Sequence, residues 1–196
     1  MSDEIILGYI NKNLSKQRYS HSVSVAETAK KIGEDLDLPD RDVKELYTAG
    51  LCHDIAKELP KDEQIKLIEK HQKLSSEDLV CRSTLHQLAG AYLARELFGI
   101  NDRVFGMIRY HCTGSPDMTL CEKIIFISDY IEPLREHHSC VLLRRYFTER
   151  RTDLRLIDVT AAKCCKRTLD LLESKGHPIH PLTIKTYEKL KNIAYN

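Results

Sequence analysis

The chain has 196 residues, 42% of them hydrophobic and 30% charged, and its formal net charge of +1 creates no field that would draw it to nucleic acid or membrane. The acidic start and the short apolar run KIIFI indicate neither a signal peptide nor a bilayer-spanning helix. Seven scattered cysteines, without a C-x-x-C pair, favour reduced thiols in a cytoplasmic protein over a zinc site of the cysteine type.

Nearly every segment has the helical spacing of apolar residues, and none shows the alternation of a strand. In chain order, helices are expected over residues 3–14, 17–36, 41–57 (capped by Asp40) and 61–72. Further helices are expected from Ser83 or Thr84 to Leu97, from Asn101 or Asp102 to His111, over 119–132, over 153–174, and from Pro181 to about Ala194. With no internal repeat or dividing linker, the sequence predicts one all-α domain over residues 1–196.

Four of the nine histidines lie on, or at the end of, apolar helix faces: His21, His53, His86 and His111. Each alone is more often a hydrogen-bonded core residue than a metal ligand. Four on separate helices, one of them followed by Asp54, favour a metal site, because the core of a bundle brings facing side chains together. Asp129, after the apolar run KIIFI, supplies a second carboxylate.

The other five histidines have simpler interpretations. His71, His137 and His138 are expected in solvent, the last two in a loop after Pro133. His177 and His180 have i,i+3 spacing, but the prolines around them break the helix that would align them on a metal.

The order H…HD…H…H…D resembles that of the HD-domain metal-dependent phosphohydrolases. The matching strings lie between Arg18 and Arg135: RYSHS, HDIAK, LH with AG behind it, IRYHCTG and SDYIEPLR. They are most similar to the YqeK-type branch of bacterial symmetrical diadenosine-tetraphosphate hydrolases. The resemblance implies a helical bundle whose metal-site core spans about residues 17–135, with C-terminal helices in 139–194 packing on it.

This resemblance also implies a ligand set. One divalent ion would be held by His21, His53, Asp54 and Asp129, and a second by Asp54, His86 and His111. The two oxygens of Asp54 would bridge the ions, and a bridging hydroxide between metals roughly 3.5–4 Å apart would attack phosphorus. Imidazole-rich ligation suits iron or zinc better than magnesium. The resemblance favours iron, with manganese or zinc as alternatives.

Basic residues lie at helical steps from the expected ligands. Arg18 comes one turn before His21, Lys57 follows Asp54, and Arg135 follows the last carboxylate in steps of three. We expect all three cations to bind substrate phosphates, and Lys57, Arg135 and Asp54 to act in catalysis.

Thr113 and Gly114, after His111, are expected to offer a hydroxyl and backbone N–H groups to the same phosphates. Glu132 is also assigned to the substrate-binding region, where it would orient Arg135 or a ligand. Two positions depart from the pattern of the branch: Cys112 stands where threonine is common, and Ser128 where alanine is common. Neither is a ligand position, but Cys112 lies beside a ligand and could tune the site.

The function that the resemblance implies is cleavage of diadenosine tetraphosphate at its centre, giving two nucleoside diphosphates. One alternative is another HD phosphohydrolase, acting on a dNTP, a cyclic dinucleotide or guanosine tetraphosphate. Others are a di-iron oxygenase and a non-enzymatic signalling module that has lost its metal. Guanosine-tetraphosphate hydrolases resemble the mononuclear version without counterparts of His86 and His111, and an oxygenase would not need the flanking cations. Both a monomer and a homodimer are compatible with the sequence.

Overall fold

The computed structural model describes residues 2–195, and all regular secondary structure in this range is helical, which confirms the all-α prediction. The elements are α1 (Asp3–Asn13), α2 (Lys16–Asp35), α3 (Asp40–Cys52), α4 (Lys61–Glu69), α5 (Ser76–Val80), the 3-10 helix η1 (Arg82–Thr84), α6 (Leu85–Phe98), α7 (Asp102–Arg109), α8 (Leu120–Ile131), α9 (His138–Thr148), α10 (Leu154–Ser174) and α11 (Pro181–Tyr195). None of the helices within the described range is both long and apolar enough to cross a membrane.

Helix caps set several of the predicted boundaries. Asn101 caps α7 by accepting a hydrogen bond from the backbone N–H of Val104 at 3.0 Å. Thr119 and Glu122 form a reciprocal capping box at the start of α8. Gly99 ends α6 in the left-handed conformation, with φ of 61°.

One predicted helix start is wrong, and one helix was not predicted. Pro39 occupies the N-cap position of α3, so Asp40 is the first residue of that helix and not its cap. His138 begins α9 instead of lying in the loop expected for it, and His137 caps this helix by accepting from the N–H of Ser139. A histidine cap is uncommon, so the usual Ser, Thr, Asp or Asn signal is missing here.

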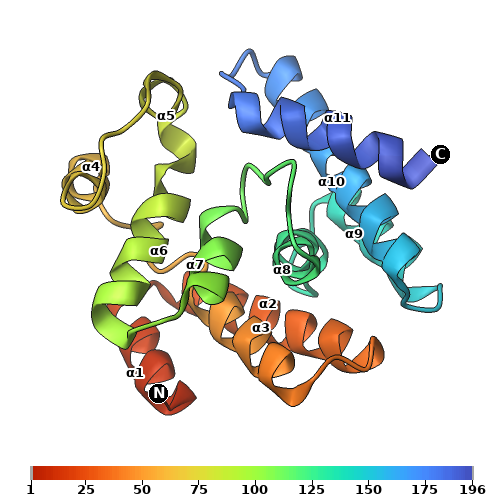
Figure 1. Ribbon diagram of the computed structural model, residues 1–196, viewed down its shortest axis with the longest axis horizontal. Coiled ribbons are helices and arrows are strands. Elements are labelled where there is room, and N and C mark those ends of the chain that lie inside the picture. The colour runs from red at the N-terminus through yellow and green to blue at the C-terminus, as the bar shows by residue number, and fades with distance from the viewer. Residues whose placement is uncertain (1, 196) are drawn as a thin grey trace.

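Helices α2, α3, α7 and α8 form the centre of the fold. In Figure 1, α8 is seen nearly end on, with α2 and α3 below it, α7 on one side and α10 on the other. Helix α3 packs on α2, α7 and α8, and α8 also packs on α10. Ile124, Ile125 and Ile127 of α8 are fully buried, because this helix is covered on most of its sides.

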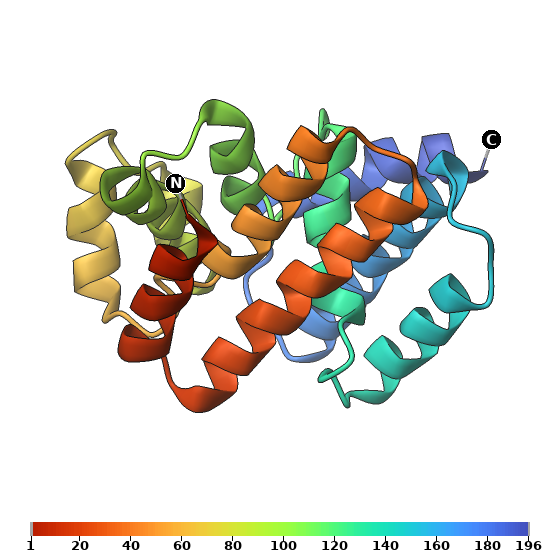
Figure 2. The same cartoon turned by 90° about the horizontal axis from the view of Figure 1, so that it is seen from below.

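The C-terminal helices reach the loop that follows α7. Helices α10 and α11 pack along each other, as Figures 1 and 2 show. Gly114, in the loop before α8, has φ of 66°, and a Cβ atom there would lie 2.6 Å from Cγ2 of Thr186 on α11. This position therefore requires glycine both for its backbone conformation and for contact with α11.

Helix α3 ends earlier than the predicted range 41–57. Its last residue is Cys52, and the chain continues in turns whose hydrogen bonds reach back three residues: the N–H of Ile55 donates to the carbonyl of Cys52 at 3.1 Å, and that of Lys57 to Asp54 at 2.9 Å. Just before this point, a Cβ atom on Gly50 would lie 2.4 Å from Cα of Ala26. The close approach of α3 to α2 brings the turn after α3 beside α2.

Candidate metal centre

The six predicted metal ligands meet in the centre of the fold. They come from α2 (His21), the turn after α3 (His53 and Asp54), α6 (His86), the turn after α7 (His111) and α8 (Asp129). The exposed fractions are 7% for His21, 0% for His53, 3% for Asp54, 1% for His86 and 3% for His111, while Asp129 is half-buried. So much buried polar surface is costly unless the side chains satisfy one another or a ligand.

The four imidazoles are all oriented through Nδ1. In His53, His86 and His111, this atom donates to the carbonyl of the residue three positions earlier, at 2.7, 3.0 and 2.8 Å. In His21, Nδ1 lies 3.1 Å from Oε1 of Glu132. Since carbonyl and carboxylate oxygens only accept, Nδ1 carries a proton in each ring, and in the neutral form of each imidazole Nε2 directs its lone pair into the cluster.

We define the first donor group as Nε2 of His21, Nε2 of His53, Oδ2 of Asp54 and Oδ1 of Asp129. Nε2 of His21 lies 3.2 Å from Nε2 of His53 and 3.0 Å from the Asp129 oxygen. The Asp54 oxygen lies 3.8 Å from Nε2 of His21 and 3.6 Å from Nε2 of His53. Four donor atoms from three elements thus surround one small volume.

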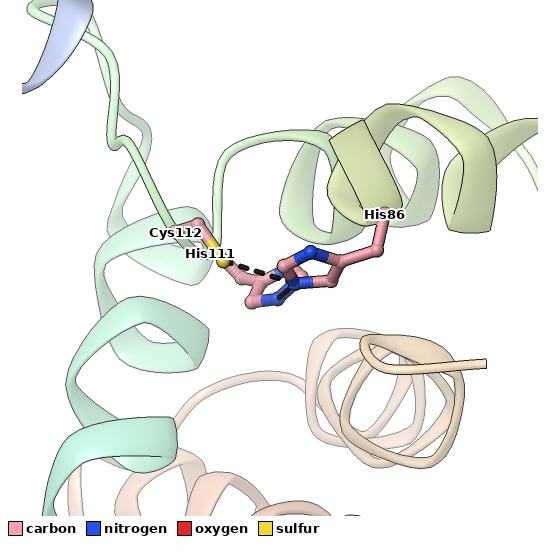
Figure 3. A group of neighbouring side chains, drawn as sticks. All are labelled: His86, His111 and Cys112. Carbon is pink, nitrogen blue, oxygen red and sulfur yellow. Dashed lines mark hydrogen bonds between the residues drawn. The ribbon is translucent and has the colours of Figure 1, made fainter. Parts of the chain in front are cut away.

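The second donor group consists of Oδ1 of Asp54, Nε2 of His86 and Nε2 of His111. The two nitrogens are 3.2 Å apart, and the Asp54 oxygen lies 3.3 Å from His86 and 3.5 Å from His111. Figure 3 shows the two imidazoles meeting through their Nε2 atoms, with the thiol of Cys112 directed at the same point. Asp54 therefore presents one oxygen to each group, which is the arrangement that a bridging carboxylate requires.

Both donor groups fit a divalent metal ion. Two ligands that are each about 2.0–2.2 Å from one ion lie roughly 3–3.6 Å apart, close to most of the donor separations found here. The Nε2 atoms cannot hydrogen-bond to one another when both carry lone pairs, so their close approach favours a cation between them. In addition, Oδ1 of Asp54 is buried and has no hydrogen-bond partner.

The charges of the cluster also suit a cation. Burial acts to raise the pKa of Asp54, but the surrounding imidazoles of His53, His111 and His86 outweigh it and hold the pKa well below its usual range. Burial opposes ionisation of Asp129 too, yet Arg135 and His21 lower its pKa well below the usual range. Burial lowers the pKa of His53 to about 4. Two carboxylates are therefore ionised, and His53 is a neutral donor at neutral pH.

The three predicted phosphate-binding cations border the cluster. Nη1 of Arg18 lies 2.6 Å from Oδ2 of Asp54, and Nη2 of Arg135 lies 2.5 Å from Oδ1 of Asp129. Nζ of Lys57 is 3.0 Å from Nε2 of His86 and 4.0 Å from Asp54. The three-residue turn aligns Lys57 with Asp54, so each cation is within reach of a donor residue and of any anion bound there.

The structure does not support phosphate binding by Thr113 and Gly114. The hydroxyl of Thr113 is buried and donates to the Gly114 carbonyl at 3.0 Å, while its N–H donates to Oε1 of Gln87 at 3.2 Å. The N–H of Gly114 donates to the carbonyl of Tyr110 at 2.9 Å. These groups are already satisfied within the protein. Gln87, adjacent to His86 in the sequence, is the residue that sequence reasoning missed here.

Glu132 has a different position from the one assigned to it. It is only 1% exposed, and it contacts Nδ1 of His21 through Oε1 while Oε2 accepts from the N–H of Leu134 at 2.6 Å. Its substrate-binding assignment is therefore not supported. Of the two orienting roles considered, this contact favours orientation of a predicted ligand, His21, over orientation of Arg135.

The remaining histidines lie outside the cluster. His71, His137 and His138 are exposed, as predicted. His177 is exposed whereas His180 is buried, so the two do not form a joint site. Instead, Nε2 of His180 lies 3.4 Å from Oδ1 of Asp78, and this contact lowers the pKa of Asp78 to about 2. The pair links the start of α11 to α5, two segments with no sequence signal of proximity.

The model of the HD domain family matches residues 18–134, the range that contains all six donor residues. The chain is 37% identical over 187 residues to a protein of Halalkalibacterium halodurans and 34% identical over 192 residues to one of Bacillus subtilis. Both are named symmetrical bis(5'-nucleosyl)-tetraphosphatase. The matches cover 94% of this chain and 94% of the first protein, and 97% of this chain and 98% of the second.

A solved structure has a very similar fold. The crystal structure of a predicted HD superfamily hydrolase involved in NAD metabolism, from Clostridium acetobutylicum, superposes with a TM-score of 0.87 and 32% sequence identity. The superposition covers 98% of each chain. On the family match and these similarities over almost the whole length, the chain belongs to the HD domain family.

Proposed function

We propose that this protein hydrolyses diadenosine tetraphosphate symmetrically to two molecules of ADP. The observation that carries the proposal is the position of Asp54, whose two oxygens each face a separate donor group. A polyphosphate substrate requires a site that holds positive charge against several phosphates, and two adjacent ion sites with bordering cations provide it. The relatives from Halalkalibacterium halodurans and Bacillus subtilis, named for this reaction, support the substrate class.

The proposed resident cofactor is a pair of divalent transition-metal ions, with iron favoured. His21, His53 and Asp129 would hold one ion, His86 and His111 the other, and Asp54 both. Four imidazoles and two carboxylates suit iron, zinc or manganese better than magnesium. When bound, such ions supply Lewis acidity toward phosphoryl oxygen and a water activated near neutral pH.

The protein's own side chains would position the substrate. Arg18, Lys57 and Arg135 carry three positive charges at the edge of the cluster, and their contacts with Asp54, His86 and Asp129 place these charges beside both donor groups. Guanidinium groups bind phosphate through paired N–H donors, whereas the Lys57 ammonium acts as a point charge. We assign all three to the phosphates, with Lys57 and Arg135 also stabilising charge that develops during cleavage.

The second donor group separates this proposal from the alternatives. A mononuclear guanosine-tetraphosphate hydrolase would not need the convergence of His86 and His111 on Asp54. The bordering cations favour a phosphorylated substrate over the chemistry of a di-iron oxygenase. A signalling module that had lost its metal would have no reason to retain all six donors in one cluster, five of them buried.

The position of cleavage tests the function. Hydrolysis of diadenosine tetraphosphate in oxygen-18 water should give ADP alone, with label in one of each two molecules, because water attacks one of the two inner phosphates. Formation of ATP and AMP would contradict symmetrical cleavage. Turnover of a cyclic dinucleotide or a dNTP by metal-loaded protein that leaves diadenosine tetraphosphate intact would instead favour one of the other HD phosphohydrolases.

A further inference from the structure

Cys112 is the donor that the six-residue set leaves out. It follows His111 in the turn after α7, and its Sγ atom lies 3.1 Å from Nε2 of His86. Sγ and one ring nitrogen each of His86 and His111 all lie within 4.8 Å of one another, close enough for one ion. Figure 3 shows the thiol pointing to the place where the two imidazoles meet.

The main chain fixes Cys112 in this position. Its N–H donates to Oε1 of Gln87 at 3.1 Å, and the same oxygen accepts from the N–H of Thr113 at 3.2 Å. Gln87 is fully buried and directly follows His86 on α6. One buried amide thus links the backbone that carries the thiol to the helix that carries the imidazole. The distance between Sγ and His86 is therefore set by the fold and not by a free rotamer alone.

The two donor groups are unequal without this sulfur. The first group has four protein donors, whereas the second has three, one of which is the shared Asp54. Oδ1 of Asp54 is buried, has no hydrogen-bond partner and faces His86 and His111, which marks the same point as a place for a cation. Adding Sγ of Cys112 gives the second group four donors too, the usual number for a tetrahedral ion.

We propose that Cys112 is a fourth protein ligand of the second ion, so that this position is a His₂–Asp–Cys site selective for thiophilic divalent metals. The inference rests on the metal centre of the proposed function and adds a ligand to it. A thiolate is a soft ligand that favours zinc, cobalt or iron over manganese or magnesium. The two ion sites of one chain would then differ in metal preference: oxygen and nitrogen donors in the first, and sulfur in addition in the second.

Cobalt(II) tests the proposal directly, because a thiolate ligand adds a sulfur-to-cobalt charge-transfer absorption in the near ultraviolet that imidazole and carboxylate do not. Metal-free protein is titrated with Co²⁺, and binding is followed both by this band and by the visible ligand-field bands. In the wild type, Co²⁺ should bind in two steps, and the charge-transfer band should develop in only one of them, because only the second ion has a sulfur ligand. Cys112→Ser and Cys112→Thr should abolish this band while keeping the ligand-field bands.

Cys121→Ser is the control, because Cys121 is also a free cysteine but lies on the first turn of α8, near Arg103. This variant should keep the full charge-transfer band. In Cys112→Ser, the affinity of one site for Zn²⁺ should fall by at least about tenfold, with a smaller change for Mn²⁺. Thiol substitution elsewhere should change neither affinity.

The outcomes are distinct for the two proposals. Cobalt binding without a charge-transfer band in the wild type, or a band that persists in Cys112→Ser, would overturn the ligand assignment and leave the proposed function intact. A normal band in protein that does not cleave diadenosine tetraphosphate would overturn the function and leave Cys112 as a ligand. Failure to bind Co²⁺ at all would overturn both.

Discussion

The two donor groups share Asp54 but are oriented by different means. In the first group, a main-chain carbonyl orients His53, but side chains orient the other two residues that are not shared: Glu132 contacts Nδ1 of His21, and Arg135 contacts Asp129. In the second, the main chain orients both histidines: His86 and His111 each donate to a carbonyl three residues earlier. The first group should therefore be sensitive to single charge substitutions, and the second to changes in the turns that carry it.

The groups also differ in the sequence separation between each histidine and the residue that orients it. The contact from Glu132 to His21 joins helices separated by most of the family domain, whereas each carbonyl contact of the second group closes within one turn. The first group forms only when α2 and α8 are docked, while each histidine of the second is oriented locally. Variants that affect only one donor group test this contrast between support from a distant helix and local orientation.

The largest expected effect comes from the residue that both groups share. Asp54→Asn keeps the volume of the side chain but loses its charge. The substitution should therefore lower the affinity for both ions by more than about a hundredfold and abolish turnover. His86→Ala removes a donor of the second group alone and should leave one ion bound. Elemental analysis of the two purified variants measures the difference. Equal metal content in Asp54→Asn and wild type would exclude a bridging role.

The bordering cations should affect turnover more than metal content. Lys57→Ala, beside the second group, and Arg135→Ala, beside the first, each remove a charged hydrogen bond to substrate that is worth roughly 1.5–3 kcal/mol, or about ten- to a hundredfold in kcat/KM. Metal content should remain near two ions per chain. Arg135→Lys and Lys57→Arg, which keep the charge, should recover part of the loss. Wild-type kinetics in both alanine variants would show that these cations do not touch substrate.

Orientation of His21 should influence the affinity for the first ion but not for the second. Glu132→Ala removes the acceptor from Nδ1, so the imidazole is no longer fixed and affinity for the first ion should fall by roughly 10- to 100-fold. Glu132→Gln retains an acceptor oxygen and should lie between this variant and the wild type. Titration of metal-free protein resolves the two binding steps. If both steps weakened equally in Glu132→Ala, the division into two separately supported groups would be wrong.

The smallest expected effect on the metal centre comes from the packing of α2 on α3. Gly50→Ala would place Cβ 2.4 Å from Cα of Ala26, a backbone atom, and should cost about 1–3 kcal/mol in the free energy of unfolding. Moving α3 away from α2 also displaces His53 from His21, so the affinity for the first ion should fall more than the affinity for the second. Urea denaturation and metal titration measure these effects.

Gly8→Ala provides the control for this substitution. A Cβ atom on Gly8 in α1 would have no atom within 4 Å beyond its chain neighbours and the nearby backbone of its own helix, so the same change should be neutral or stabilising by up to about 1 kcal/mol, the helix preference of alanine over glycine. A similar loss of stability in both variants would mean that the close contact at Gly50 is not the cause.

Helical periodicity predicted most of the helices and the convergence of the six donor residues, because both depend on which side chains face the core. It did not predict the end of α3 at Cys52, where hydrogen bonds spanning three residues replace the helix. Nor could it assign Glu132 and Gln87, since a contact such as the one from Glu132 to His21 depends on how two distant helices dock. The hydrogen bonds of Thr113 and Gly114 were not predicted either: the N–H of Thr113 donates to Gln87 on α6, and that of Gly114 donates to the carbonyl of Tyr110, four residues earlier.

The central claim is that the carboxylate of Asp54 links two metal ions, and electron paramagnetic resonance of the manganese-loaded protein tests it most directly. Metal-free protein is loaded with one and then with two equivalents of Mn²⁺ per chain. With two equivalents, the account predicts the spectrum of a magnetically coupled pair, which Asp54→Asn should not give at any loading. Two tightly bound Mn²⁺ ions that show only isolated, uncoupled signals would contradict the claim.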